Sequence, residues 1–249
     1  MKELNVLSID WDYFIDASIE QRDELFPDPN DNLPQLLKSF VWANRYAEND
    51  LMKIQVDYQA HNSLLYYLIN LRDTEHDCVT IVADSHRELY SAICEKNVKK
   101  VNLLNIDFHH DCYDLGDENL TCGNWLRILS QDTDLNAAWI KRKDSDTDGD
   151  LSAIGNKMVS NDLSSDIFNL FHDQCPDIIF LCRSDPWSPP HLDRSFSMMI
   201  DLLYDVSGSI TWSDEPNDMD DRYTPEFVEL SNQIKRQTEK LLSKYNIKK

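Results

Sequence analysis

The sequence predicts an α/β fold in three layers, with a mostly parallel sheet between two layers of helices. Short apolar runs alternate along the chain with segments whose apolar residues recur every three or four positions. The runs are nearly continuous, which is typical of strands that are covered on both faces. No internal repeat or Gly/Ser-rich linker interrupts the 249 residues, so we expect residues 1–249 to form one domain.

The strands are predicted from five apolar runs, of which the fifth is weaker than the others. They cover residues 4–9, 78–83, 101–106 and 177–182, and less clearly 137–141. Helical spacing of apolar residues is found between and after these runs. It predicts helices at 33–47, 58–71, 87–96, 123–130 and 164–173, and longer ones near 191–206 and 225–245. Segments rich in Pro and Asp are expected to be surface loops, at 26–34, 184–190 and 213–225.

The composition restricts the classes of partner. The chain carries 45 acidic and 24 basic residues, a formal net charge of −21. This balance argues against binding to nucleic acid or to an anionic membrane surface, because both require a basic face. A cationic substrate would be attracted, although solubility alone explains the charge equally well. The two glycine-rich nucleotide-binding motifs, GxGxxG and GxxxxGK[ST], are absent from the sequence.

The cysteines and the apolar segments indicate a compartment. Six cysteines are present and none forms a CxxC motif; Cys78 and Cys182 lie in apolar runs, where a free thiol behaves as a small hydrophobic side chain. The N-terminal apolar run is too short for a signal peptide, and no run of eighteen apolar residues occurs. We therefore expect a protein of the reducing cytoplasm.

Residues of metal-ligand type follow three of the predicted strands. In a parallel α/β sheet, ligands bind at the carboxyl ends of the strands. A spacing of two residues near a strand end points both side chains the same way. The residues are Asp10 and Asp12 after the first strand, His86 after the second, and Asp107, His109 and Asp111 after the third.

These side chains predict a site for two metal ions. Packed together without a cation, the carboxylates would repel one another or stay protonated, and a divalent ion removes that conflict. Carboxylates with some imidazole favour hard or borderline ions such as manganese. Four Asp and two His are too many for one ion that keeps an open position. Two ions about 3.5–4 Å apart, bridged by shared carboxylates, fit the number better.

Two other readings of the same residues remain open. A phosphatase would use Asp10 as nucleophile and Asp12 as acid and base, but that mechanism gives His86, His109 and Asp111 no role. A non-catalytic acidic module whose metal is structural or lost is the other alternative.

The motifs resemble those of a known family. DxHxD at 107–111, SxDxD at 8–12 and an Asp-x-His around His86 are similar to the three ligand motifs of the arginase/agmatinase ureohydrolases. In arginase proper SxDxD comes last, whereas here it comes first. That order resembles a diverged branch that contains the peptide arginases of bacterial modified-peptide biosynthesis.

The resemblance implies a fold, a reaction and a ligand set. The fold is the arginase/deacetylase-like α/β fold; a deacetylase normally uses one zinc ion, whereas the additional aspartates here favour two ions. The reaction is manganese-dependent hydrolysis of arginine side chains in a precursor peptide, which yields ornithine and urea. His86, Asp107, Asp111 and Asp10 would hold one manganese ion. His109, Asp107, Asp10 and Asp12 would hold the other, with Asp107 and Asp10 bridging.

The resemblance also indicates candidate catalytic residues. The family's Ser-Gly-Asn-Leu-His segment corresponds to residues 121–126, which retain Asn124 but have Leu126 where the proton-shuttling histidine is expected. His110 or His191 is an alternative shuttle. Asp185, at the end of the last predicted strand, is the candidate partner of the substrate guanidinium, although an Asp that opens a turn explains it equally well.

A loop at 144–155 resembles a calcium-binding loop. Asp144, Asp146, Asp148 and Gly149 match the first half of such a loop, but Gly155 replaces its bidentate Glu. We therefore expect a solvated acidic loop.

Overall fold

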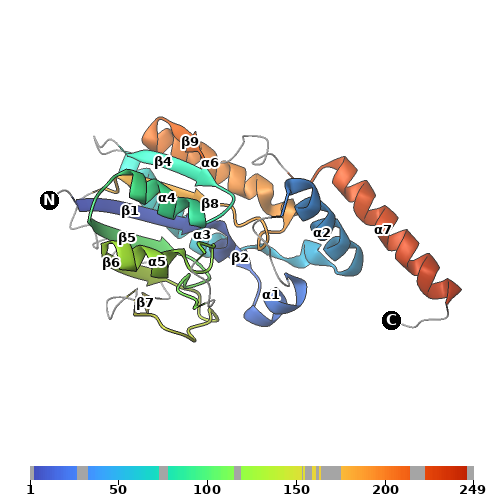
Figure 1. Cartoon of the computed structure of the whole chain (residues 1–249). Coiled ribbons are helices and arrows are strands. Elements are labelled where there is room, and N and C mark those ends of the chain that lie inside the picture. Colours follow the sequence, from blue (N-terminus) through green and yellow to red (C-terminus); the bar gives the residue numbers. More distant parts are fainter. Residues whose placement is uncertain are drawn as a thin grey trace.

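The computed structural model describes residues 3–26, 33–72, 78–114, 119–152, 154, 159–160, 163, 175–213 and 222–245. It confirms the three-layer α/β fold (Figure 1). Within the described residues, the central sheet has seven strands in the order β7-β6-β5-β1-β8-β4-β9, and every neighbouring pair is parallel. The strands are β1 (Glu3–Asp10), β4 (Val79–Ala83), β5 (Lys100–Ile106), β6 (Asp134–Ile140), β7 (Val159–Ser160), β8 (Ile178–Cys182) and β9 (Ile210–Trp212).

The five predicted strands form the centre of this sheet, and the sequence did not indicate its edges. β7 and β9 have two and three residues, too few for an apolar pattern to be recognised. A separate antiparallel pair, β2 (Ile15–Asp16) and β3 (Gln55–Val56), is equally short.

Six of the seven predicted helices lie in described residues and are present. They are α2 (Gln35–Glu48), α3 (Tyr58–Arg72), α4 (Arg87–Glu95), α5 (Trp125–Asp132), α6 (Asp193–Ser207) and α7 (Pro225–Lys244). The helix predicted at 164–173 lies outside the described residues.

Helix α1 (Ile19–Leu25) was not predicted, because the one residue that it buries is Arg22 and its sequence has no apolar stripe. Its start nevertheless carries a recognisable signal. Ser18 and Gln21 form a capping box, in which each side chain accepts a hydrogen bond from the other's backbone N–H.

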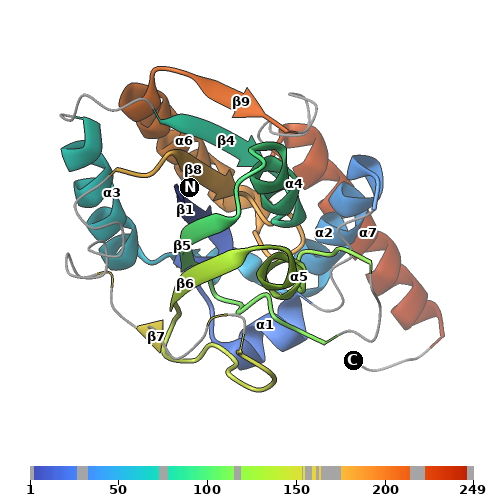
Figure 2. The ribbon, with the colours of Figure 1, turned by 60° about the vertical axis from the view of Figure 1, so that its left-hand side comes forward.

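The helices bury both faces of the sheet, as the continuous apolar runs predict. On one face, Leu7 and Ile9 of β1 belong to a core that includes residues of α3 and α6. On the other face, Leu4 and Val6 belong to a core that includes residues of α4 and α5. In Figure 2, α3 and α6 lie to the left of the sheet and α4 and α5 to its right. Alternate residues of one strand therefore supply two separate cores.

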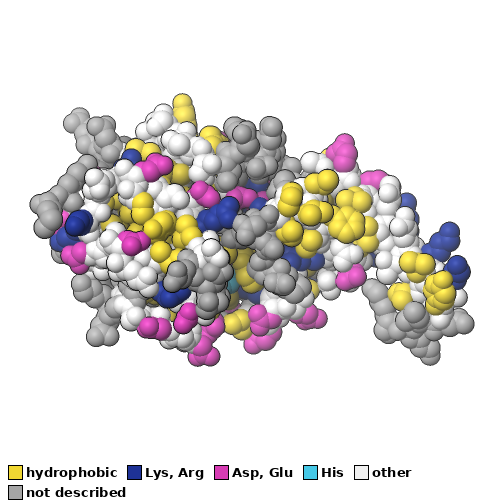
Figure 3. All heavy atoms as spheres, in the orientation of Figure 1, with side chains coloured by type: hydrophobic (Ala, Val, Ile, Leu, Met, Phe, Trp, Pro, Cys, Tyr) yellow, Lys and Arg dark blue, Asp and Glu magenta, His cyan; other side chains and the backbone are white. Residues whose placement is uncertain are grey.

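The surface shown in Figure 3 has an apolar cluster over α2 and acidic side chains along its lower margin. Leu36, Leu37 and Phe40 are the large exposed apolar residues of α2. Among the helices of the described residues, none combines the length and the apolar character needed to cross a membrane.

The α3 helix offers a direct test of the core. Leu64 is fully buried and Tyr66, two residues later, is 72% exposed. We expect Leu64→Ala to lower the free energy of unfolding by about 2–5 kcal/mol, because it leaves a cavity. Tyr66→Ala is the matched control and should change it by less than about 0.5 kcal/mol. Urea titration followed by circular dichroism measures both, and equal effects would contradict the assigned face of α3.

Candidate metal centre

The register of the central strands brings the predicted ligands to one edge of the sheet. Ile9 of β1 lies opposite Ile106 of β5, so Asp10 and Asp107 follow at the same level. On its other side, Asp10 lies opposite Cys182 of β8. Figure 1 shows that these strands end together, with α1 and α2 beyond their carboxyl ends. Chain segments about a hundred residues apart thus contribute to one small volume.

The DxD sequence begins at Asp10, the last residue of β1, and continues into a short 3-10 helix, η1 (Trp11–Phe14). Asp10 caps this turn, and its Oδ1 accepts a hydrogen bond from the Asp12 N–H at 2.9 Å. Arg22 of α1 holds the turn, since its Nη2 donates to the carbonyls of Asp12 and Ile15 at 2.8 and 2.9 Å. The Asp12 carboxylate is consequently buried, with its Oδ2 3.7 Å from Arg22 Nη1.

His86 precedes α4 and is held in one orientation. Its ring stacks on Phe180 at 5.6 Å between centroids and packs against Trp125 at 5.0 Å. Its Nε2 lies 2.6 Å from Ser8 Oγ. The opposite nitrogen, Nδ1, therefore faces three carboxylate oxygens, those of Asp10, Asp107 and Asp111 at 3.1, 3.1 and 3.2 Å.

The DxHxD segment curls around the end of β5. Asp107 Oδ1 accepts the His109 N–H at 2.8 Å, which tightens the turn. Asp111 adopts a positive φ of 53°, and its Oδ2 accepts a hydrogen bond from the Trp125 indole at 2.5 Å. His109 Nδ1 lies 3.0 Å from Asp12 Oδ2 and 4.0 Å from Asp107 Oδ1.

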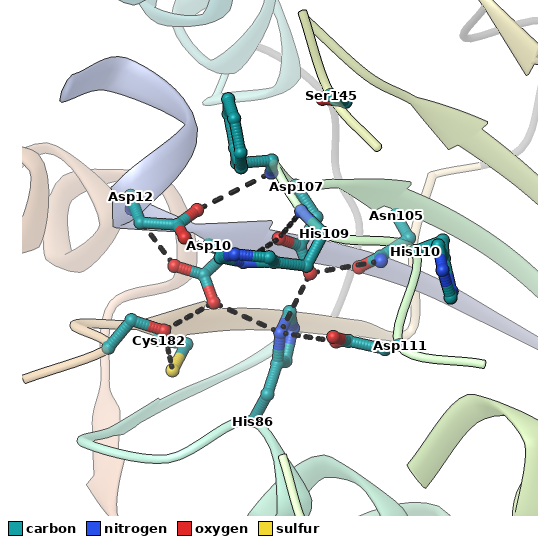
Figure 4. A network of polar contacts seen from close by, with 12 residues as sticks. Asp10, Asp12, His86, Asn105, Asp107, His109, His110, Asp111, Ser145 and Cys182 are labelled. Carbon is teal, nitrogen blue, oxygen red and sulfur yellow. Dashed lines mark hydrogen bonds and ion pairs between the residues drawn. The ribbon is translucent and has the colours of Figure 1, made fainter. Parts of the chain in front are cut away.

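We call the ligands around His86 (Asp10, His86, Asp107, Asp111) the first subsite and those around His109 (Asp12, Asp107, His109) the second subsite. Potential ligand atoms of Asp12, Asp107 and His109 lie within 4.8 Å of one another, as do those of His86, Asp107 and Asp111. Asp107 belongs to both groups. Figure 4 shows these side chains converging from β1, η1, the start of α4 and the loop after β5.

Two buried ligand-type atoms could each contact a cation here. His86 Nδ1 and Asp12 Oδ2 are fully buried, and neither makes a hydrogen bond despite oxygen or nitrogen atoms about 3 Å away. A buried polar atom without a partner is costly. A divalent ion between each orphan and its neighbours would satisfy it and neutralise the carboxylates.

The pKa values reflect the crowding of charge. Burial raises the pKa of Asp10 to about 7, assisted by the charges of Asp12 and Asp107. Burial and the charge of Asp111 raise the pKa of Asp107 to about 8. Burial alone would lower the pKa of His109, but Asp12 outweighs it and raises the value to about 9. Without metal, the site therefore retains protons that a metal ion must displace.

The site opens beside His109. The His109 side chain is 18% exposed, whereas those of the other five ligands are at most 6% exposed. Trp187, which is partly buried, covers the His109 ring at 4.6 Å between centroids. A nearby cavity of about 430 Å³ is lined by Tyr13, adjacent to Asp12, and by Asp57, Arg142 and Asp144 among others. His109 is therefore the most accessible of the six candidate ligands.

Comparison with protein-family models, curated proteins and solved structures finds no match for this chain. The resemblance to the ureohydrolases therefore stays a prediction that rests on the motifs.

The structure gathers the six predicted metal ligands but places the predicted catalytic residues elsewhere. His110 lies at the margin of Figure 4; its Nδ1 accepts the Cys112 N–H at 3.0 Å and its Nε2 lies 3.1 Å from the Asp148 carbonyl. Asn124 bonds the backbone of Thr121 and Asn119. Both side chains hold loops together, and neither points a free polar atom at the ligands.

His191, the alternative shuttle, is also occupied. Its Nδ1 bonds the Tyr46 hydroxyl and its Nε2 lies 2.9 Å from the Ile54 carbonyl.

Asp185 is buried among the chain's own cations. Arg183 donates to both of its oxygens, Arg222 Nη1 lies 3.4 Å from Oδ1, and Lys38 Nζ lies 3.9 Å from Oδ2. Burial would raise the pKa of Asp185, but Arg222 and Arg183 outweigh it and lower the value. The oxygens of Asp185 are thus already bound to guanidinium groups of the chain itself.

Three residues of the site have roles that the sequence did not indicate. Ser8 and Trp125 hold His86 and Asp111, and Ser184 donates a hydrogen bond to Asp10 Oδ2 at 2.5 Å. Ser184 has a φ of 51°, a left-handed conformation that is uncommon for a residue with a side chain. Ser8 and Trp125 do lie inside quoted motifs, whereas Ser184 reaches Asp10 only through the order of the strands.

The acidic loop after β6 shows an ordinary turn. The Asp148 N–H donates to Asp146 Oδ1 at 2.7 Å, and Gly149 has a φ of 111°. None of the ligand groups found among the described residues includes these aspartates, and residues 153 and 155 lie outside the described residues.

The raised pKa values predict how the metal-free protein responds to pH. Folded Asp10, Asp107 and His109 retain protons up to about pH 7, 8 and 9, whereas the ordinary values are 3.8, 3.8 and 6.5. The folded state then binds more protons than the unfolded state, so stability falls as the pH rises through this range. We expect the melting temperature without metal to decrease from pH 6.5 to 9, and added divalent ion to remove the decrease. A melting temperature that is independent of metal at pH 9 would contradict the site.

The position of Asp185 predicts a loss of stability without a loss of metal. Asp185→Ala leaves buried Arg183 and Arg222 without a carboxylate they share, which should cost about 3–5 kcal/mol. The exposed pair of Asp50 and Lys53 provides the control, since Asp50→Ala should cost less than about 1 kcal/mol. Chemical unfolding measures both variants. Metal content per folded Asp185→Ala chain should equal that of the wild type. A loss of metal from the folded variant would show that Asp185 contributes to metal binding.

Proposed function

We propose that this protein is a binuclear metal hydrolase that acts on the guanidinium groups of arginine side chains in a peptide, producing ornithine and urea. The observation that carries the proposal is the sharing of Asp107 between two ligand groups, one around His86 and one around His109. A carboxylate with an orphaned ligand atom on each side is suited to bridge two ions.

When bound, two divalent ions such as manganese would supply a nucleophilic water at neutral pH. The chain's own residues provide the geometry. Ser8 fixes which nitrogen of His86 faces the site. The Trp125 indole donates to Asp111 Oδ2 and so fixes the orientation of that carboxylate. Trp187 over His109 restricts bulk water at the entrance, which strengthens the electrostatic interactions inside.

The charge supports a cationic substrate. The whole chain has a formal net charge of −21, whereas the two proposed ions would neutralise the four carboxylates of the site. The charge of the rest of the chain would draw a guanidinium ion towards the protein. A peptide is favoured over free arginine because the family segment that contains the shuttling histidine has buried Leu126 here, which points to an altered substrate. Cys94, Cys112 and Cys182 are free thiols, which supports a place in the reducing cytoplasm.

The phosphatase alternative receives less support. A nucleophilic Asp10 would need a free oxygen that faces the substrate. Its Oδ1 accepts the Asp12 N–H, its Oδ2 accepts the Ser184 hydroxyl, and its side chain is 4% exposed. His109 is the accessible ligand instead.

The first test is metal content, measured by elemental analysis after supply of manganese. We expect about two ions per wild-type chain, and loss of both in Asp107→Ala because that carboxylate serves both subsites. Asp16→Ala, in the exposed edge of β2, is the matched control and should retain two. One ion or none per wild-type chain would contradict the binuclear mechanism.

The second test is urea release from arginine-containing peptides. His109→Ala should reduce the rate by at least about a hundredfold, because it removes a ligand of the second subsite. The same variant should have a mild effect on a phosphatase that uses Asp10 and Asp12. Turnover of a phosphate ester with no urea release would support that alternative.

A further inference from the structure

The register of the sheet places one residue beside the first subsite that the ligand motifs do not contain. Cys182 is the last residue of β8, directly between Asp10 of β1 and Ala83 of β4. Residues opposite each other in neighbouring parallel strands point to the same face of the sheet. The thiol and the Asp10 carboxylate therefore project together, and His86 lies three residues beyond Ala83.

The distances make Cys182 a possible ligand. Ligand atoms of Asp10, His86 and Cys182 all lie within 4.8 Å of one another. Figure 4 shows the sulfur next to Asp10, on the side away from Asp111.

Two further observations separate this thiol from an ordinary core cysteine. His86 Nδ1, in the same volume, is buried and makes no hydrogen bond. The Cys182 sulfur is 3.4 Å from Ser184 Oγ, the hydroxyl that also donates to Asp10. Cys112 provides the contrast: it is equally buried and adjacent to Asp111, yet it belongs to none of the ligand groups in the described part of the chain.

We propose that Cys182 makes the first subsite a mixed nitrogen, oxygen and sulfur site that selects a thiophilic divalent ion such as zinc or cobalt. The second subsite, with only nitrogen and oxygen ligands, takes a harder ion such as manganese. Thiolate ligands favour softer metals, whereas carboxylates suit manganese. The inference rests on the metal site of the proposed function and concerns which ion each half of it binds.

Cobalt reports directly on the sulfur. The full-length chain, stripped of metal, is titrated with Co²⁺ and followed in the near ultraviolet, where thiolate-to-cobalt charge transfer absorbs. We expect the band in the wild type and in Cys112→Ala, and its loss in Cys182→Ser, which nearly preserves side-chain volume. A wild-type protein without the band, or a Cys182→Ser protein that keeps it, would overturn the inference.

Metal competition provides a second readout. Because nitrogen and oxygen sites already bind zinc more tightly than manganese, the informative quantity is the change in the ratio of the two affinities. We expect this ratio at the first subsite to fall at least about tenfold in Cys182→Ser and to stay constant in Cys112→Ala. An unchanged ratio in Cys182→Ser would reject the thiol as a ligand.

These experiments are independent of catalysis. A cobalt–thiolate band in a protein that releases no urea would leave the inference standing and reject the proposed function. Urea release by a protein without the band would support the proposed function and reject Cys182 as a metal ligand.

Discussion

The structure depends on the burial of four carboxylates and two imidazoles in one small volume at the end of the sheet. Burial raises the pKa of Asp10 and Asp107, which means that their ionised forms are held at a cost. His86 partly offsets this cost for Asp10 and Asp107, and His109 and Arg22 offset it for Asp12. The number of buried carboxylates is the physical reason for proposing divalent metal at this site.

The surrounding side chains keep these groups in place. The His86 ring lies between Phe180 and Trp125, and Ser184, next to Asp185, holds Asp10. The loop that carries Ser184 is anchored by buried arginines: Arg222 donates to Asp193 and to the carbonyls of Asp185 and Ser188. Here cations do neutralise buried carboxylates. The molecule thus has two adjacent charge clusters, one balanced internally and one open to an ion.

Most of the centre of the fold could be predicted, because strands covered on both faces must be apolar throughout. The same reasoning predicted that the six candidate ligands lie together, since strand ends in such a sheet meet at one edge. This reasoning missed elements whose residues show no periodic apolar pattern. Helix α1 buries Arg22 instead of an apolar stripe, and β7 and β9 are too short to have a period. The candidate catalytic residues His110, Asn124 and Asp185 were predicted from position along the chain, which does not fix where a side chain points.

The sequence by itself determined the fold class, the strand ends that matter and the type of ligand, because these depend on local hydrophobicity and residue chemistry. Only the tertiary structure decided which strands are neighbours. The order β5-β1-β8-β4 places Cys182 and Ser184 beside Asp10, although β8 begins 168 residues after Asp10. Such pairing results from the packing of whole helices on the sheet, and no short stretch of sequence records it.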